Sequence, residues 1–316
     1  MGRYIIKRIL WMIPVLLGVS FLVFSLMYFT PGDPAAIILE VEATPAQMEA
    51  CREEMGLNKP FFERYITYIY QAFVKFDLGT SYINGRPVMT ELLQRFPYTF
   101  RVAGISVLVA VAIGIPLGVM AAVNQYTWKD HLSMLAALFS MSMPNFWFAL
   151  MLVLFFSLKL GWLPATGIGH WTCYLLPCFS IGVHSAAGLA RQTRSGMLEV
   201  IRQDYIVTAR AKGQRESKVI FGHALKNAMI PIITQVGTML GRQMGGAIIA
   251  ESVFSIPGIG SYMSTAIKSR DYPVVQGGVL FVAVIFALSM LLVDILYTYA
   301  DPRMKSRYES SAKKQG

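Results

Sequence analysis

Long runs of uncharged, mostly apolar residues alternate with shorter polar segments along this chain of 316 residues. A helix needs about 20 apolar residues to cross the hydrocarbon core of a membrane. Six runs come close to or exceed that length, four without a charge and two with one charge each: 9–29, 102–123, 132–158, 172–190, 228–250 and 274–300. The pattern predicts an all-α polytopic membrane protein with six transmembrane helices, called spans one to six in chain order.

The basic residues fall mainly on one side of these spans. With the N-terminus inside the cell, the inner segments carry 17 Lys or Arg and 6 Asp or Glu, and the outer segments carry 10 and 11. The inner segments are then 1–8, 124–131, 191–227 and 301–316. This is the positive-inside pattern of membrane proteins. A nucleic-acid partner would also suit the net charge of +10, but no zinc-finger, RRM or basic-zipper pattern accompanies it.

The chain divides into four parts. Residues 1–30 are expected to form an N-terminal anchor helix, because the apolar run is long for a secretory signal and no small-residue cleavage site follows it. Residues 31–98 are expected to form an extracytoplasmic helical segment. Residues 99–300 are expected to form the transmembrane core, and residues 301–316 a cytoplasmic tail.

The outer segment carries its own helix signals. Residues 44–47 (TPAQ) have the form of a capping box with proline in the first turn. A second helix is expected at 60–76, and a third at 88–96 that leads through Pro97 into span two. The second has an apolar stripe of Phe62, Ile66, Ile69 and Phe73. These helices are expected on the outer membrane surface or against the spans, with either a packing role or a docking role.

No catalytic or cofactor-binding pattern is present. The dipeptide Gly-Lys never occurs, so the phosphate-binding loop GxxxxGK[ST] is missing. The four histidines are scattered without metal-ligand spacing, and no GxSxG elbow occurs. We therefore expect a chain that is not an enzyme and that holds no cofactor or metal. Cys173 and Cys178 are expected as free buried thiols, although a bridge between them is conceivable in an oxidising compartment.

Small residues and prolines mark spans that pack closely or bend. Pro116 and Pro144 are expected to interrupt their helices, which membrane proteins tolerate beside other protein or a water-filled path. Glycines that let helix backbones approach recur at every fourth residue in spans two and five. They are Gly114 and Gly118, then Gly237, Gly241 and Gly245.

Two polar residues, Arg242 and Gln243, are expected in the middle of span five. A charge there is expensive and normally faces a partner or a cavity, so either structural pairing or a role in lining a solute path suits Arg242. The candidate path residues are Met143, Pro144, Gln235, Arg242 and Gln243.

The most informative segment is a basic, helical stretch, 204–231, between spans four and five. Gly213 is expected to let the chain turn between two short helices. The small residues Ala209 and Ala211 are expected to let the first helix sit deep in the groove of a partner. Four cations are expected either to pair with acidic residues of that partner or to form a solvated face. These are Arg210, Lys212, Arg215 and Lys218.

The sequence TARAKG (208–213), followed by HAL (223–225), resembles the EAA loop of binding-protein-dependent ABC importer permeases. The branch it resembles is that of the dipeptide, oligopeptide and nickel systems, and the chain is similar to its first permease subunit. Val207, Thr208 and Lys226 depart from the broad motif. Further matches run along the chain: PGDP (31–34), DLG (77–79), MP (143–144), SGMLEV (195–200), DYI (204–206), PGIG (257–260), RDYPVVQGG (270–278) and DPR (301–303).

The resemblance implies a type I ABC importer permease fold with a small helical extracytoplasmic insertion, in the inner membrane of a prokaryote, with both termini cytoplasmic. It implies four kinds of partner: a second homologous permease subunit, two ATP-binding subunits that hold Mg-ATP, an extracytoplasmic solute-binding protein, and membrane lipid. The solute would be a peptide, or else nickel or a glutathione-like compound. The implied ATPase-coupling loop is 191–228, with Asp204, Tyr205, Thr208, Ala209, Arg210, Ala211, Lys212, Gly213, His223 and Leu225.

Two other classes remain open from sequence. An ATP-independent secondary transporter or channel would also span the membrane, but it would more naturally show inverted repeats or a relay of intramembrane carboxylates. A membrane-bound receptor or scaffold would also explain helices suited to docking on both faces.

Overall fold

The computed structural model describes residues 2–39, 43–245 and 247–300, and they form helices joined by loops, with one isolated β-bridge between Thr80 and Pro87. The predicted 301–316 tail, including the DPR match, lies outside the described residues. The all-α prediction is confirmed. The helices, in chain order, are α1 (Gly2–Phe29), α2 (Pro34–Ile38), α3 (Pro45–Glu54), α4 (Phe61–Val74), α5 (Val88–Val123), α6 (Trp128–Ser142), α7 (Asn145–Leu152), η1 (Val153–Lys159), η2 (Trp171–Tyr174), α8 (Leu175–Ile201), α9 (Asp204–Ala211), η3 (Lys218–Ala224), α10 (Leu225–Met244), α11 (Ile248–Val253), α12 (Ile259–Lys268) and α13 (Tyr272–Ala300).

Among the described residues, five helices are long and apolar enough to cross a membrane, and a bent pair provides a sixth span if it is counted as one. The pair is Trp128–Ser142 and Asn145–Lys159, which meet at an angle of 99°. Pro144 lies at the break, as predicted, because proline offers no backbone N–H to continue the helix ladder. The six predicted spans therefore correspond to these five helices and this broken one.

The prediction that α5 would be interrupted was wrong. Val88–Val123 is one helix of 36 residues, so the expected short helix at 88–96 and span two are continuous through Pro97 and Pro116. A proline inside a helix costs about 3 kcal/mol through its lost hydrogen bond and its steric clash. Apolar residues are fully buried along the length of α5, from Val88 and Leu92 to Ala121, and this packing offsets that cost.

The predicted fifth span was placed too far toward the C-terminus. It was expected at 228–250, whereas the membrane-spanning segment is Lys218–Met244, and a separate short helix, α11, follows. Arg242 therefore occupies the last helical turn and is not in the middle of the span. A cation in the last turn of a helix interacts favourably with the helix dipole.

The helices group into two compact units, which we describe separately. The first comprises Met1–Phe100, Met244–Glu251 and Pro257–Ala287. The second comprises Arg101–Gln243, Ser252–Ile256 and Leu288–Gly316. The long helices α5 and α13 are each divided between the two units.

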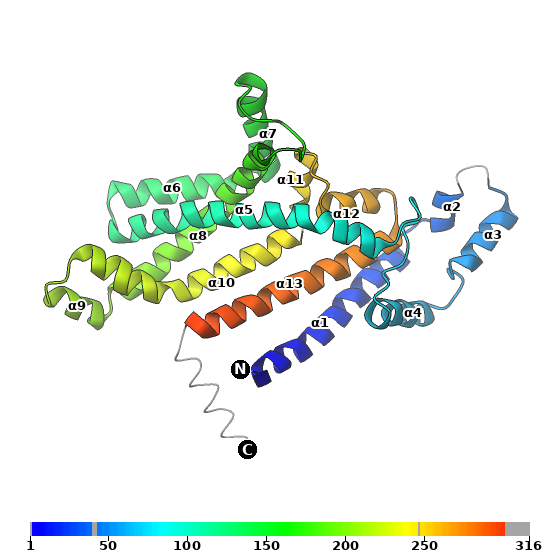
Figure 1. Cartoon of the computed structure of the whole chain (residues 1–316), viewed down its shortest axis with the longest axis horizontal. Helices are drawn as coiled ribbons and strands as arrows, with labels where there is room; N and C mark the ends of the chain where they lie inside the picture. The colour runs from blue at the N-terminus through cyan, green and yellow to red at the C-terminus, as the bar shows by residue number, and fades with distance from the viewer. Residues whose placement is uncertain (1, 40–42, 246, 301–316) are drawn as a thin grey trace, which may run out of the picture. The chain divides into compact units, whose positions relative to one another are not determined.

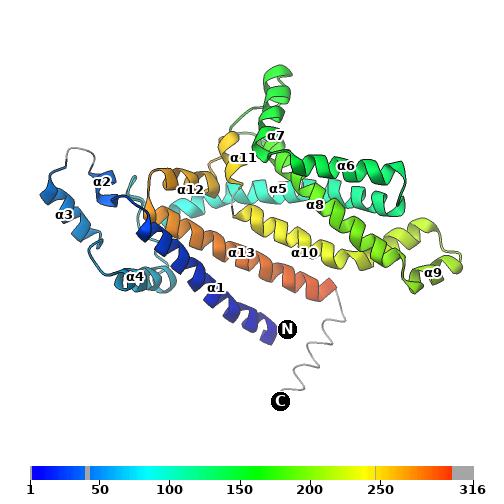
Figure 2. The same cartoon turned by 180° about the vertical axis from the view of Figure 1, so that it is seen from behind.

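In the first unit, the outer segment forms α2, α3 and α4. The predicted capping box of α3 is present, with Thr44 and Gln47 satisfying each other's backbone N–H groups. Helix α4 lies beside α1 in both views (Figure 1, Figure 2) and donates a hydrogen bond from the Tyr65 hydroxyl to the Leu17 carbonyl at 3.1 Å. Of the predicted apolar stripe, Phe62 and Ile66 are exposed, while the opposite face packs on α1.

Motifs that lie far apart in the sequence meet in the first unit. The buried Asp271 carboxylate accepts hydrogen bonds from the Ser81 hydroxyl and from the Tyr82 backbone N–H, the latter at 3.1 Å. A Cβ on Gly32 would collide with the Arg270 guanidinium, and the Tyr272 hydroxyl reaches the Gly32 carbonyl at 3.5 Å. The PGDP and RDYP matches are therefore two sides of one junction in this unit.

The second unit is built on close contact between helix backbones. A Cβ on Gly114 would lie 2.8 Å from the carbonyl oxygen of Ala186, and one on Gly118 would lie 2.5 Å from that of Ala190. A Cβ on Gly237 would likewise collide with the Val293 side chain of α13. The expected roles of these three glycines are confirmed, since only a residue without a Cβ allows the helices this close.

We expect Gly118→Ala to destabilise the protein by about 1 to 3 kcal/mol, because the added methyl group would meet backbone of α8 that cannot move aside. Gly104→Ala is the matched control on the same helix, since nothing lies within 4 Å of its Cβ position. Thermal unfolding in detergent measures both. Equal melting temperatures for the two variants would contradict the close-contact role of Gly118.

Candidate functional site: the basic loop and the polar span

The basic loop, residues 204–224, consists of α9, a glycine turn and η3, which is a π-helix. Gly213 has a φ of 74°, in the left-handed region that side chains with a Cβ adopt rarely. The two short helices joined at Gly213 are therefore present as predicted. Both views show α9 projecting beyond the ends of α8 and α10 (Figure 1, Figure 2).

One face of the loop is anchored in the core of the second unit. Ile206 is fully buried, and Ala209 is 8% exposed, in a cluster with Val219, Ile220 and Ala224 of η3. The expectation that Ala209 would enter the groove of a partner was wrong, because the side chain is used inside the chain itself. The exposed Ala211 keeps that option. Both helices of the loop are therefore packed into the core of this unit, and η3 continues directly into α10.

Polar contacts close the turn across Gly213. The Arg210 guanidinium forms an ion pair with Glu216, with Nη2 to Oε1 at 2.6 Å, and this pair holds the pKa of Glu216 below its usual value. His223 Nε2 lies 2.8 Å from the side-chain oxygen of Gln214. Sequence reasoning missed Gln214 and Glu216. The available signal was one opposite charge six residues after Arg210, across a glycine.

The opposite face of the loop is open to solvent. It combines apolar side chains, Tyr205 at 45% and Val207 at 57% exposed, with exposed cations. The Thr208 hydroxyl donates a hydrogen bond to the Asp204 carbonyl oxygen at 2.9 Å, so both groups are paired within α9. The exposed members of the predicted site are Asp204, Tyr205, Thr208, Arg210, Ala211, Lys212 and Gly213, whereas His223 and Leu225 are half-buried.

A bidentate ion pair joins α8 to α6, shortly before the chain enters the basic loop. Arg194 donates from Nε and Nη2 to the two carboxylate oxygens of Asp130, both at 2.7 Å. Asp130 is buried and also accepts a hydrogen bond from the Tyr126 backbone N–H at 3.1 Å. The pair fixes α8 against α6 seven residues before the end of α8. Sequence reasoning missed it because the partners are 64 residues apart.

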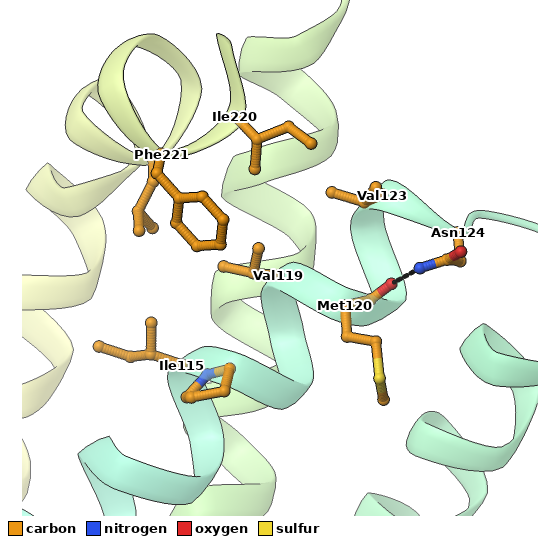
Figure 3. Close-up of a pocket in the computed structure, with 9 residues that line it drawn as sticks. Ile115, Val119, Met120, Val123, Asn124, Ile220 and Phe221 are labelled. Carbon is orange, nitrogen blue, oxygen red and sulfur yellow. Dashed lines mark hydrogen bonds between the residues drawn. The ribbon is translucent and has the colours of Figure 1, made fainter. Parts of the chain in front are cut away.

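An apolar cleft of about 300 Å³ lies between the end of α5 and η3 (Figure 3). The Phe221 ring and Ile220 come from η3, and Val119, Met120 and Ile115 come from α5. Asn124 lies at the edge, where its amide donates to the Met120 carbonyl at 2.9 Å. The cleft is almost without polar groups, so it suits an apolar side chain or an acyl chain and offers no chemistry.

The five predicted path residues fall on two elements. Met143 and Pro144 form the break between α6 and α7, where Pro144 is exposed. Gln235, Arg242 and Gln243 lie on α10. The Gln243 amide donates to the Ser185 hydroxyl of α8 at 3.2 Å, and Arg242 is exposed.

A further polar centre, which sequence reasoning missed, lies in the first unit. Glu251 is fully buried and accepts hydrogen bonds from the Thr99 hydroxyl at 2.8 Å and from the Ser261 backbone N–H at 2.9 Å. The Thr99 oxygen also accepts from the Ile259 N–H at 2.9 Å. The carboxylate therefore supplies an N-terminal cap for α12 from another helix.

The PGIG match at 257–260 makes room for this carboxylate. A Cβ on Gly258 would collide with the Glu251 carboxyl group, and one on Gly260 would lie 3.0 Å from its Oε2. Burial raises the pKa of Glu251, and the donors from Ser261, Thr99 and Gly260 oppose that rise. The usable sequence signal was a single glutamate in an apolar run, followed by two closely spaced glycines.

We expect Thr99→Val to destabilise the protein by about 1 to 3 kcal/mol, because it leaves the Ile259 N–H without its partner and removes one of the hydrogen bonds to the buried Glu251 carboxyl. Ser106→Ala is the control, since this buried hydroxyl on the same helix donates to a carbonyl of its own helix, that of Val102, and caps no other helix. Thermal unfolding compares the two. A smaller loss for Thr99→Val than for Ser106→Ala would contradict this account.

The chain matches known proteins along nearly its whole length. Residues 114–306 match the family model described as "Binding-protein-dependent transport system inner membrane component", and residues 1–103 match the model of its N-terminal region. The dipeptide transport system permease protein DppB of Alkalihalophilus pseudofirmus is 41% identical, over 96% of this chain and 100% of that protein. The glutathione transport system permease protein GsiC of Escherichia coli K12 is 40% identical, over 96% and 99%.

The fold also resembles a solved transporter. A chain of the MetNI methionine ABC transporter in an inward-facing conformation superposes with a TM-score of 0.57 at 18% sequence identity, covering 67% of this chain and 97% of that chain. With its apolar spans, its projecting basic loop and these matches along nearly its whole length, the chain belongs to the family of binding-protein-dependent transport system inner membrane components and is a permease of an ABC importer.

Proposed function

We propose that this chain is the first of two homologous permease subunits in an importer of peptides, with two ATP-binding subunits on its cytoplasmic side and a solute-binding protein outside. The basic loop is the observation that carries this proposal. It is exposed on one face, anchored in the core on the other, and joined to α8 and α10. Both termini and the basic loop then lie in the cytoplasm, as the distribution of Lys and Arg predicts.

In this proposal the loop transmits movement as a rigid body. The ATP-binding subunits close around Mg-ATP and carry the loop with them, and the loop changes the tilt of the spans beside it. Tyr205, Val207 and the exposed cations Lys212 and Arg215 offer the contact surface. Arg210 contributes by holding the turn together through Glu216, because its charge is already paired within the loop.

A peptide is the solute that the relatives favour. One relative is described as a dipeptide permease and the other as a glutathione permease. Glutathione and dipeptides share a peptide bond, a free amino group and at least one free carboxylate. We therefore propose a solute with these groups, and not a bare nickel ion, as the cargo.

Gly213→Val should insert normally but lower ATP-driven uptake by about tenfold, since a β-branched residue is strained at a φ of 74° and the turn would rearrange. Gly213→Asn is the control, because asparagine adopts this region more readily and should keep most of the uptake. Uptake of a radiolabelled dipeptide and ATP hydrolysis are measured together in proteoliposomes. Undiminished uptake by Gly213→Val would remove the coupling role of the turn.

Purification from membranes through a tag on this chain should recover an ATP-binding subunit and a second permease in stoichiometric amounts. Quantitative mass spectrometry of the purified complex gives the ratio. Recovery of a homo-oligomer of this chain that transports without ATP would refute the proposal in favour of a secondary transporter.

A further inference from the structure

Helix α10 differs from the other spans in what it exposes. Its exposed positions are all polar, namely Lys226, Asn227, Thr234 and Arg242, and no large hydrophobic side chain of α10 is exposed. By contrast, α1 exposes residues such as Leu10, Trp11, Leu22 and Leu26, the expected composition of a surface in lipid. The exposed face of α10 is therefore unsuited to contact with acyl chains.

Three of these polar residues lie on one side of the helix. At 3.6 residues per turn, Asn227, Thr234 and Arg242 fall within an arc of about 80°. The Thr234 and Thr238 hydroxyls donate back to carbonyls of α10, at 3.3 and 2.8 Å, so neither needs a partner on another chain. A face of this kind is compatible with water beside it.

The only charges on α10 are positive. Lys226 lies near the start of α10 and Arg242 in its last turn, and α10 contains no Asp or Glu. Within the described residues, Arg242 has no ion pair or hydrogen-bond partner. A charged side chain in a span normally faces a cavity or a compensating charge, so an unpaired arginine on this polar face is suited to binding an anion.

We propose that Arg242 binds the free carboxylate of the transported solute at the outer end of a path lined by the polar face of α10. This inference rests on the proposed import function, which places the end of α10 on the outer side. Guanidinium matches carboxylate geometry with two parallel N–H donors, which a point charge does not provide. The neighbouring Gln243 amide donates to the Ser185 hydroxyl at 3.2 Å, which holds this end of α10 against α8.

The test compares a dipeptide with the same dipeptide amidated at its C-terminus, in proteoliposomes that contain the whole transporter. The binding protein is saturated with each peptide, and saturation is checked separately by its intrinsic fluorescence. Wild-type uptake should favour the free acid. Arg242→Gln should lower uptake of the free acid by about tenfold and leave uptake of the amide nearly unchanged.

Lys268→Gln is the matched control, because Lys268 is also an exposed cation in the last turn of a helix, α12. It should not change the preference between the two peptides. Equal losses of both peptides in Arg242→Gln, or dissociation of the complex, would overturn the proposal and assign Arg242 to an ion pair with the second permease. Absence of ATP-driven uptake in the wild type would instead refute the proposed function itself.

Discussion

The lack of hydrogen-bonding partners in the hydrocarbon core is the constraint on which this structure depends. A backbone N–H or carbonyl in lipid has to be satisfied within its own helix, so the apolar runs form helices. Buried polar groups at the ends of the spans also need partners, because burial in protein removes water as one. The Glu251 carboxylate caps α12, and Asp130 binds both Arg194 and a loop N–H group.

Helix association without a hydrophobic driving force depends on fit. Gly114, Gly118 and Gly237 let backbones approach until a methyl group would no longer fit. Gly258 and Gly260 likewise lack a Cβ, and the space is filled by the Glu251 carboxylate and not by another helix. Close helix contact and the burial of a carboxylate thus both depend on the missing side chain of glycine.

The basic loop and the polar face of α10 meet on one continuous stretch of chain, because η3 leads directly into α10. Ile206 and Val219 pack the loop into the same core as the start of α10, so the proposed movement of the loop would carry the start of α10 with it. The element proposed to receive the ATP-driven movement is therefore the element whose exposed side chains are proposed to contact the solute. This short connection needs no separate relay between the two.

By itself, the sequence determined the fold class, the number of spans, the break at Pro144, the capping box at Thr44 and the left-handed turn at Gly213. These follow from local physics, since apolar length, missing backbone donors and steric freedom act within a few residues. Only the tertiary structure decided the rest. The continuity of α5 through its prolines, the burial of Ala209, the Asp130–Arg194 pair and the cap formed by Glu251 depend on residues distant in sequence. No local pattern reports which groups packing will bring together, and so the contacts that hold the candidate site in place became apparent only in the folded chain.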